Sequence, residues 1–346
     1  MGKDANIATV ALDVMGADAT PDSIIHGGIW AARECPDDLR VILVGKTEVV
    51  NNTIQGLKEL PPNLDFQDAP HSVAMSDTAT EGVRKKTSSI AVGLMMQKKG
   101  KVDALVSAGN TGAVMASSIL ILGRVEGITR PAIGSFFPTS TGRPTLVLDV
   151  GANVGCKPAT LYQFGLMGSI YTSLMGGRTS PKVGLLSIGE EKSKGNELIF
   201  QTHALFEKSD LNFVGNVEGR NVLTGEIDVI VTDGFVGNIL LKFAESVEGF
   251  LTSSLRRQVS TNIFSRVGAG LMRPFLKRLR RSFDYAESGG APLLGVDGVS
   301  IICHGSSSPK AIKNAILTAA EMVRHNIHGN IRSEMNDANN DVSNGL

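Results

Sequence analysis

The sequence predicts an α/β fold built on a mostly parallel sheet, and three observations point to it. Short β-branched apolar runs recur along the 346 residues, with helical stretches between them. Most of these runs end in a small or acidic residue followed by a glycine-rich turn. Hydrophobic residues make up 42% of the chain and glycine contributes 39 residues, so a large core can form. We expect strands at residues 7–12, 41–44, 104–106, 145–148, 183–186, 229–231 and 300–302.

Charge and cysteine content narrow the class of protein. Lys plus Arg and Asp plus Glu both number 34, so no global field favours nucleic acid, and any charged partner must meet a local patch. Cys35, Cys156 and Cys303 are too few and too far apart for a disulfide framework or a zinc site. The first residues lack the pattern of a signal peptide. These features favour a cytoplasmic protein.

Two uncharged stretches, 104–123 and 158–177, are long enough to suggest membrane spans. Both are interrupted by glycines and polar side chains, so buried elements are the better interpretation. No repeat or linker divides the chain, and we expect a single domain over residues 1–330. The polar residues 331–346 predict a disordered tail.

Polar residues gather where the predicted strands end. Loops rich in glycine and polar side chains follow five of them, at 13–16, 107–112, 149–153, 187–196 and 232–238. In open α/β sheets ligands bind beyond the carboxyl ends of the strands. We therefore expect these loops to meet in one shared crevice, with Asp13 on its first loop.

Two of these loops are suited to an anion. Asn110, Thr111 and Gly112 precede a helical run, where backbone N–H groups and the helix dipole favour negative charge. Asp149 and Asn153 repeat the arrangement after the next strand. An ordinary capped turn is the alternative for each. A nucleotide-binding P-loop is rejected, because the glycine spacing is wrong and no hydroxyl stands where magnesium would be held.

The loop at 187–196 begins with Ser187 and ends at Asn196, and it carries two lysines that would neutralise a phosphate. We choose Lys194 as the catalytic lysine and expect a mobile active-site loop. The alternative is a surface loop in which Lys192 and Lys194 pair with neighbouring glutamates for little energetic gain.

Two residues, Asp233 and His304, are candidates for proton transfer. Asp233 opens a glycine-containing turn that ends at Asn238 and enters a long helix, and His304 lies at the last strand-to-helix junction. A helix cap for Asp233 and a structural role for His304 remain the alternatives.

A basic amphipathic segment occupies residues 249–283, which contain no acidic residue. Its apolar residues recur at roughly helical spacing, and Pro274 is expected to kink or split the helix. Anionic membrane or an acidic protein would bind such a segment, and a helix buried at a dimer interface is the alternative. The contact residues we expect are Arg256, Arg257, Arg266, Leu271, Phe275, Lys277 and Arg278.

Several catalytic patterns are absent from the sequence. It contains no G-x-S-x-G elbow, no H-E-x-x-H pattern and no complete G-x-G-x-x-G after the first strand. Serine nucleophile and dinucleotide chemistry are therefore disfavoured, and we assign no metal and no cofactor.

Six motifs together resemble the bacterial acyl-ACP:phosphate acyltransferases of phospholipid synthesis. They are ALDVMGAD at 11–18, SAGNTGA at 107–113, LDVGANV at 148–154, LSIGEE at 186–191, TDGFVGN at 232–238 and GAPLLGV at 290–296. The resemblance implies a three-layer α/β/α fold related to phosphotransacetylases and to isocitrate and isopropylmalate dehydrogenases. It also implies a homodimer that passes acyl phosphate to a membrane glycerol-3-phosphate acyltransferase.

This resemblance leads to a mechanistic hypothesis. Asn110, Thr111, Asn153 and Lys194 would hold phosphate in line with the thioester of an acyl carrier protein. Ser187 or Asn238 would stabilise the oxyanion, and Asp233 and His304 would manage protons. Three rival classes remain: a phosphotransacetylase using a small acyl-CoA, a metal- and NAD-dependent dehydrogenase, and a non-catalytic membrane-bound scaffold.

Overall fold

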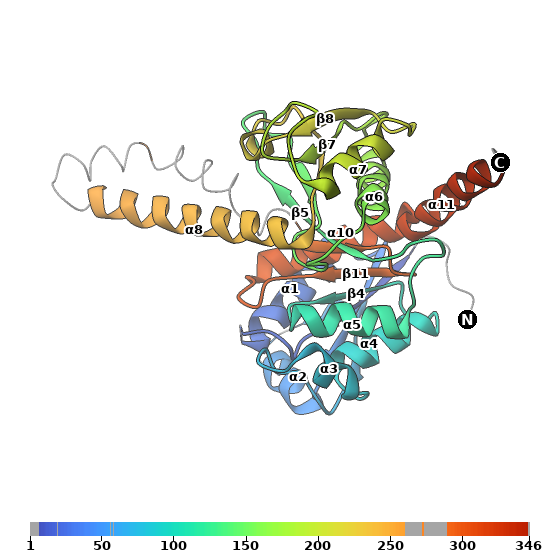
Figure 1. Ribbon diagram of the computed structural model, residues 1–346. Helices are drawn as coiled ribbons and strands as arrows, with labels where there is room; N and C mark the ends of the chain where they lie inside the picture. The colour runs from blue at the N-terminus through green and yellow to red at the C-terminus, as the bar shows by residue number, and fades with distance from the viewer. Residues whose placement is uncertain are drawn as a thin grey trace.

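The computed structural model describes residues 7–344 apart from 19, 56, 58, 260–271 and 273–288. Within that part of the chain one sheet of eleven strands runs in the order β3-β2-β1-β4-β11-β10-β5-β6-β9-β7-β8, with helices on both faces (Figure 1). The strands are β1 Ala8–Asp13, β2 Leu39–Gly45, β3 Leu64–Asp68, β4 Ala104–Ser107, β5 Ala132–Phe137, β6 Thr145–Leu148, β7 Val183–Leu186, β8 Phe213–Val217, β9 Val229–Val231, β10 Ala291–Leu294 and β11 Val299–Ile302. The helices are α1 Pro21–Glu34, α2 Thr47–Ile54, α3 Ala79–Arg84, α4 Ser89–Lys98, α5 Thr111–Ile121, α6 Pro158–Gly176, α7 Glu197–Phe206, α8 Gly234–Val259, α10 Pro309–Arg324 and α11 Ile327–Asn344, with a 3-10 turn η1 at Gly219–Leu223.

The sheet consists of two parallel halves joined by antiparallel strands. Strands β3, β2, β1, β4 and β11 are parallel, as are β6, β9, β7 and β8. Between the halves, β10 pairs antiparallel with β11 and β5, and β5 pairs antiparallel with β6. The three reversals make the second half run opposite to the first along the hydrogen-bonded ladder.

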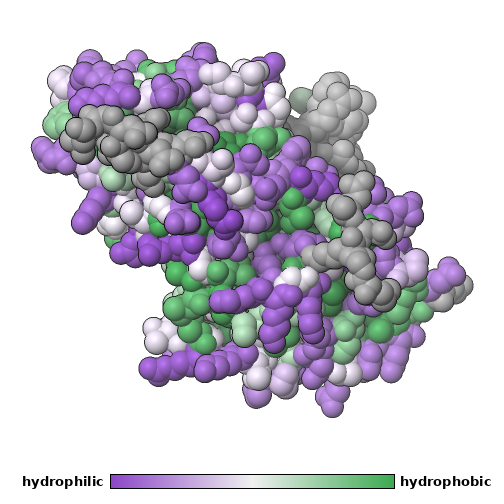
Figure 2. Space-filling model, turned by 90° about the vertical axis from the view of Figure 1, so that its right-hand side faces the viewer, coloured by the Kyte–Doolittle hydropathy of each residue, from purple (hydrophilic) through white to green (hydrophobic). Residues whose placement is uncertain are grey.

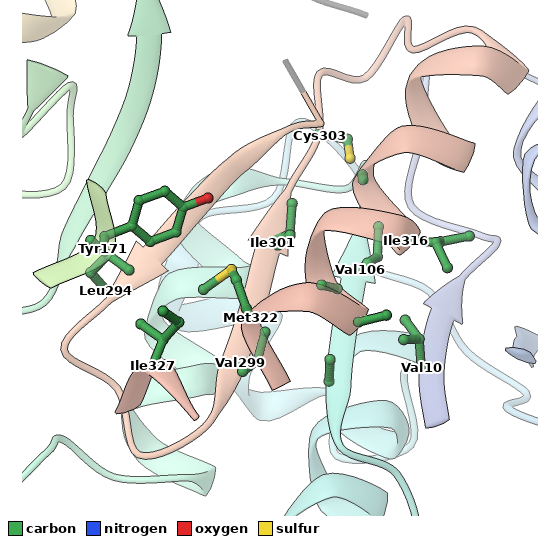
Figure 3. Packing of buried hydrophobic residues seen from close by; sticks show 14 of the residues in the cluster. Val10, Val106, Tyr171, Leu294, Val299, Ile301, Cys303, Ile316, Met322 and Ile327 are labelled. Atoms are coloured by element: carbon green, nitrogen blue, oxygen red, sulfur yellow. The ribbon is translucent and has the colours of Figure 1, made fainter. Parts of the chain in front are cut away.

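The core of the first half lies between the sheet and the helix pair α1 and α10. Val10 of β1, Val106 of β4 and Ile301 of β11 face Ile316 of α10, as Figure 3 shows. Gly27 allows α1 and α10 to approach closely, because a β-carbon there would lie 2.6 Å from Cβ of Ile312. Helices α4 and α5 pack together on the other side, with α4 against β1 and β4.

In the second half, helix α6 packs against the central strands. Gly168 permits this contact, since a β-carbon there would lie 2.6 Å from Cγ1 of Val229. Phe164, Tyr171 and Phe206 are fully buried between α6, α7 and the sheet. The uncharged stretch 158–177 is thus a core helix, and 104–123 contains β4 and α5. No described helix is long and apolar enough to cross a membrane.

All seven predicted strands are present; three have the predicted boundaries and four differ by one or two residues at an end. Four further strands were not predicted, for physical reasons. β3 is a polar edge strand, β5 and β8 contain glycine, and β10 contains Pro292, so none shows a clear run of β-branched residues.

The expectation of a disordered tail at 331–346 is wrong for residues 331–344, which continue helix α11. Ile327, Ile331 and Met335 recur every four residues and are buried, and α11 contacts α6. This apolar spacing was overlooked because polar residues dominate the composition. The side of the molecule that includes α11 shows apolar patches separated by hydrophilic residues (Figure 2).

Helix α8 projects from the region between the two halves of the sheet (Figure 1). It includes the first part of the basic segment predicted at 249–283. Arg256 and Arg257 lie in this helix, and Arg257 is exposed. The remaining predicted contact residues, Arg266, Leu271, Phe275, Lys277 and Arg278, lie outside the described residues.

Candidate active site

The loops after β1 and β4 are joined by a buried polar contact. Ser107 Oγ donates to Asp13 Oδ2 at 2.7 Å and accepts from the Gly109 amide at 3.1 Å. The other carboxylate oxygen of Asp13 accepts from the Met15 amide at 3.0 Å. Asp13 is 1% exposed, so its side chain holds the two loops together and is not available to a ligand.

Asn110 caps helix α5, as the alternative interpretation predicted. Its Oδ1 accepts from the Ala113 amide at 3.0 Å, and its Nδ2 donates to the carbonyls of Met75 and Asp77. These contacts use both Nδ2 protons, which corrects the expectation that the Asn110 side chain donates to phosphate. Thr111 and Gly112 occupy the first turn of the eleven-residue helix α5, where amides and dipole favour an anion.

The loop after β11 lies beside this helix start. A β-carbon at Gly305 would lie 2.5 Å from Oδ2 of Asp18 and 3.2 Å from Cε of Met75, so this loop contacts both the β1 loop and the segment that Asn110 holds. His304 is exposed, and the Ser306 amide donates to its Nδ1 at 3.2 Å. The neutral ring therefore carries its proton on Nε2. Asp13, Asn110, Thr111, Gly112 and His304 form the first group of predicted residues.

Asp149 lies at the centre of a second group. Its carboxylate accepts from the amides of Ile133, Gly151, Ala152 and Asn153, and from Asn153 Nδ2 at 2.9 Å. Burial raises the pKa of Asp149, and these donors act against that effect by stabilising the charged form. Asn153 Nδ2 also donates to the Pro131 carbonyl at 2.7 Å. Both side chains thus serve the structure, which corrects the expectation that Asn153 donates to phosphate.

The start of α8 packs directly on this group. Gly234 donates its amide to the Asn153 carbonyl at 2.8 Å, and a β-carbon at Gly237 would lie 1.9 Å from the Asp149 carbonyl oxygen. Asp233 caps the helix by accepting from the Val236 amide at 2.9 Å, and it is half-buried. Asn238 is exposed, and its side chain lies close to Gly151.

A third group is the loop between β7 and α7. Ser187 Oγ donates to the Lys194 carbonyl at 3.2 Å, and Asn196 caps α7 by accepting from the Ile199 amide. Lys192 is paired with Glu207 at 2.7 Å. Lys194 forms no ion pair with any residue that the structure describes. Lys194 stays the predicted catalytic lysine.

The expectation that all five loops meet in one shared crevice needs correction, because the strands that carry them do not all run in the same direction. The carboxyl ends of β1, β4 and β11 carry the first group, and those of the neighbouring strands β6, β9 and β7 carry the second and third groups. The antiparallel pairings of β10 and β5 place these two sets at opposite edges of the ladder. In Figure 1 the sheet turns between its halves, and α8, which starts from the second group, leaves the molecule between them.

Two residues that the sequence did not indicate belong to these groups. Asn216 of β8 holds the Lys194 loop, and His203 of α7 contacts Asn216. Asn216 was missed because its glycine-containing strand was missed, and a single histidine inside an apolar helix gives no signal by itself.

One described cavity lies away from these three groups. It has a volume of about 430 Å³ and lies between α6, α11 and the segments 179–181 and 210–212. None of its lining residues belongs to the three groups.

The three thiols are poor candidates for a nucleophile. Burial raises the pKa of Cys156 to about 11 and that of Cys303 to about 12, and it also raises the pKa of Cys35. Cys156 lies near the carboxylates of Asp149 and Asp233, which raise its pKa further. A thiolate is therefore strongly disfavoured at neutral pH.

Comparison with known sequences decides the family. The family described as "Fatty acid synthesis protein" matches residues 8–329. The chain belongs to this family. It is 45% identical to a phosphate acyltransferase of Nostoc over 328 residues, which cover 94% of this chain and 95% of the relative. It is 47% identical to a phosphate acyltransferase of Synechocystis, with 94% of each chain covered.

Solved structures confirm the predicted fold. The EutD phosphotransacetylase from Staphylococcus aureus superposes with a TM-score of 0.62 at 17% identity, over 92% of this chain and 94% of that one. A 4-hydroxythreonine-4-phosphate dehydrogenase from Burkholderia phymatum gives 0.51 at 13% identity, over 91% and 98%. At this identity the likeness concerns the fold alone. The family thus has an α/β architecture also found in phosphotransacetylases and a dehydrogenase.

Proposed function

We propose that this chain transfers a long-chain fatty acyl group from acyl carrier protein to inorganic phosphate. The product is an acyl phosphate, which a membrane glycerol-3-phosphate acyltransferase consumes in phospholipid synthesis. The observation that carries the proposal is the full-length similarity to phosphate acyltransferases. It is supported by a helix start suited to an anion and by Lys194, which forms no ion pair within the described part of the chain.

Phosphate binds at the start of α5 in this proposal. The amides of Thr111 and Gly112 point along the helix dipole, and Asn110 keeps that turn in place through its cap and its bonds to Met75 and Asp77. Lys194 supplies the positive charge from the other half of the sheet. The role of Asn110 is therefore to position the turn, and the role of Lys194 is to contact phosphate.

The reaction needs no covalent enzyme intermediate. An oxygen of monohydrogen phosphate attacks the thioester carbonyl, and the tetrahedral oxyanion accepts a hydrogen bond from the Asn238 side chain. The Ser187 hydroxyl is not assigned to the oxyanion, because its proton is donated to the Lys194 carbonyl. The carbon–sulfur bond then breaks with its electron pair moving to sulfur, and the acyl phosphate leaves. The proton lost by phosphate balances the proton gained by the thiolate.

Asp233 and His304 manage these protons. Asp233 is half-buried with one oxygen used by the Val236 amide, and it accepts the proton of phosphate. His304 is exposed and carries its proton on Nε2, from which it donates a hydrogen bond to the leaving thiolate, and the proton held by Asp233 then passes to the sulfur. The proposal requires both residues to reach one reaction centre from the two halves of the sheet.

A homodimer covers the first turns of α8. Phe235, Ile239 and Phe243 are 56%, 53% and 67% exposed, which is unusual for large apolar side chains spaced four residues apart on one helix. A second copy of this chain would bury them in a self-complementary contact. Light scattering on Phe243→Glu should then give the mass of a monomer, against twice that mass for the unaltered protein.

The basic segment at 249–283 contacts anionic membrane, with acyl carrier protein docking along its basic edge. Phe250 and Leu251 are 66% and 55% exposed and continue the apolar face of α8 toward Arg256 and Arg257. Flotation with liposomes of anionic lipid tests this placement. Leu271→Glu with Phe275→Glu should abolish flotation while leaving the dimer intact.

The decisive experiment mixes palmitoyl-ACP, phosphate and purified protein and traps the product with hydroxylamine. Hydroxamate that forms only when phosphate is present supports the proposal. Acetyl-CoA in place of palmitoyl-ACP tests the phosphotransacetylase alternative. Turnover of acetyl-CoA with none of palmitoyl-ACP would overturn the proposed donor.

A further inference from the structure

We propose that Asn216 is a positioning residue for Lys194: its side-chain amide fixes the loop 187–196 and thereby sets where the Lys194 ammonium lies. This inference rests on the proposed role of Lys194 in phosphate binding. It adds a residue from β8, a strand that contributes nothing else to the candidate site. The contacts that Asn216 and His203 make around Lys192 and Lys194 support this inference.

Asn216 holds both ends of one turn in the loop. Its Nδ2 donates to the carbonyls of Glu191 at 3.1 Å and of Lys194 at 3.3 Å. The same turn is closed by the Lys194 amide, which donates to the Glu191 carbonyl at 2.9 Å. The backbone at Lys194 is therefore fixed by a side chain that is itself only 5% exposed.

His203 fixes the orientation of this amide. Because both Nδ2 protons of Asn216 are used, its Oδ1 faces His203 Nδ1 at 3.0 Å, and the ring must donate from Nδ1. His203 is 7% exposed, and its ring packs edge-on against Phe213 with centroids 5.0 Å apart. A flipped amide would place Oδ1 against the carbonyl oxygens of Glu191 and Lys194, so the Asn216 side chain has one orientation.

The chain of contacts ends on Lys192 and leaves Lys194 free. His203 Nε2 lies 3.4 Å from Glu207 Oε1, and Glu207 pairs with Lys192. The stem of Lys194 lies over Gly189, where a β-carbon would be 2.7 Å from its Cγ. One lysine thus anchors the loop, while the other has a fixed backbone, a supported stem and an ammonium that pairs with no described residue.

Asn216→Asp tests the proposal with little change in shape. It replaces the donor by an oxygen that faces two carbonyls, so the turn should open. We expect KM for phosphate to rise about tenfold or more, and trypsin to cleave after Lys192 and Lys194 about tenfold faster. The matched control is Asn212→Asp, because Asn212 Nδ2 also donates to a carbonyl, that of Ser180 at 3.0 Å. The control should leave both measurements unchanged.

A double-mutant cycle separates positioning from a general structural effect. If Asn216 acts through Lys194, then Asn216→Asp should cause no further loss of kcat/KM in a Lys194→Ala background. An equal loss in both backgrounds would contradict the proposal. His203→Gln keeps a donor for Asn216 Oδ1 and should retain more activity than His203→Phe. Should Asn216→Asp fail to fold, Asn216→Ser replaces it in the same double-mutant cycle, because it removes the amide without adding charge.

The outcomes distinguish this inference from the proposed function. Unaltered protein that makes no acyl phosphate contradicts the proposed function, and the cleavage assay needs no substrate. Active protein in which Asn216→Asp changes neither KM for phosphate nor cleavage of the loop contradicts the positioning role alone. Faster cleavage with unchanged kinetic constants also contradicts it, because the loop would then be held for stability only.

Discussion

Ser107 Oγ donates a 2.7 Å hydrogen bond to Asp13 Oδ2, which joins the carboxyl ends of two neighbouring parallel strands. The two loops that follow approach until a β-carbon at Gly16 would lie 2.8 Å from the Gly109 Cα. The contact therefore fixes the entrance to α5, where we place phosphate.

Ser107→Ala should destabilise the protein by about 1–3 kcal/mol, because it leaves a buried carboxylate oxygen without its donor. The measurement is the midpoint of urea unfolding. Ser135→Ala is the matched control, since Ser135 is 2% exposed and its Oγ has no hydrogen-bond partner among the residues that the structure describes. That substitution should be neutral or slightly stabilising, and an equal loss in both variants would contradict the role of Ser107.

Asn110→Ala should lower the free energy of unfolding by about 1–2 kcal/mol through loss of the α5 cap. It should also weaken phosphate binding, because the turn that presents Thr111 and Gly112 loses its anchors at Met75 and Asp77. Calorimetric titration with phosphate checks the second effect. Unchanged stability would show that the capping contacts are not formed in solution.

Gly237→Ala should be severely destabilising, because its β-carbon would lie 1.9 Å from the Asp149 carbonyl. Gly249→Ala in the same helix should instead stabilise by about 0.5–1 kcal/mol, because nothing lies within 4 Å of its β-carbon. Thermal melts of the two variants should shift in opposite directions. A similar shift for both would mean that α8 does not pack on the Asp149 loop.

The thiols should react slowly with DTNB at about pH 8, because each pKa is raised and the thiolate is the reactive form. For Cys156, with a pKa of about 11, only about one molecule in a thousand is ionised at that pH. The rate should rise with pH up to that value in the folded protein. Rapid reaction of the native protein near pH 7 would contradict the burial of these groups.

Lys194→Ala should reduce kcat/KM by about a hundredfold or more, whereas Lys192→Ala should change it by less than about tenfold. The reason is that Lys192 is already neutralised by Glu207, while Lys194 has no ion pair among the described residues. Both lysines lie on exposed loop positions, so neither change should alter the melting temperature by much. Equal losses of kcat/KM in the two variants would contradict the assignment of Lys194 as the lysine that contacts phosphate.

The sequence predicted the seven strands with clear β-branched runs, and it located every loop of the candidate site. It could not show that the β10 and β5 pairings reverse the sheet between Ser107 and Asp149, because strand direction depends on contacts distant in sequence. It also could not tell whether Asn110 and Asn153 serve a ligand or the backbone, since both roles favour the same residue. The structure assigns their side-chain amides to the backbone.

Direct attack by phosphate is the central claim, and phosphate labelled with oxygen-18 at all four positions tests it most directly. With palmitoyl-ACP and purified protein, phosphorus-31 NMR should show an acyl phosphate that keeps all four labelled oxygens. Release of free fatty acid without acyl phosphate, or an acyl phosphate that has lost label, would contradict the account.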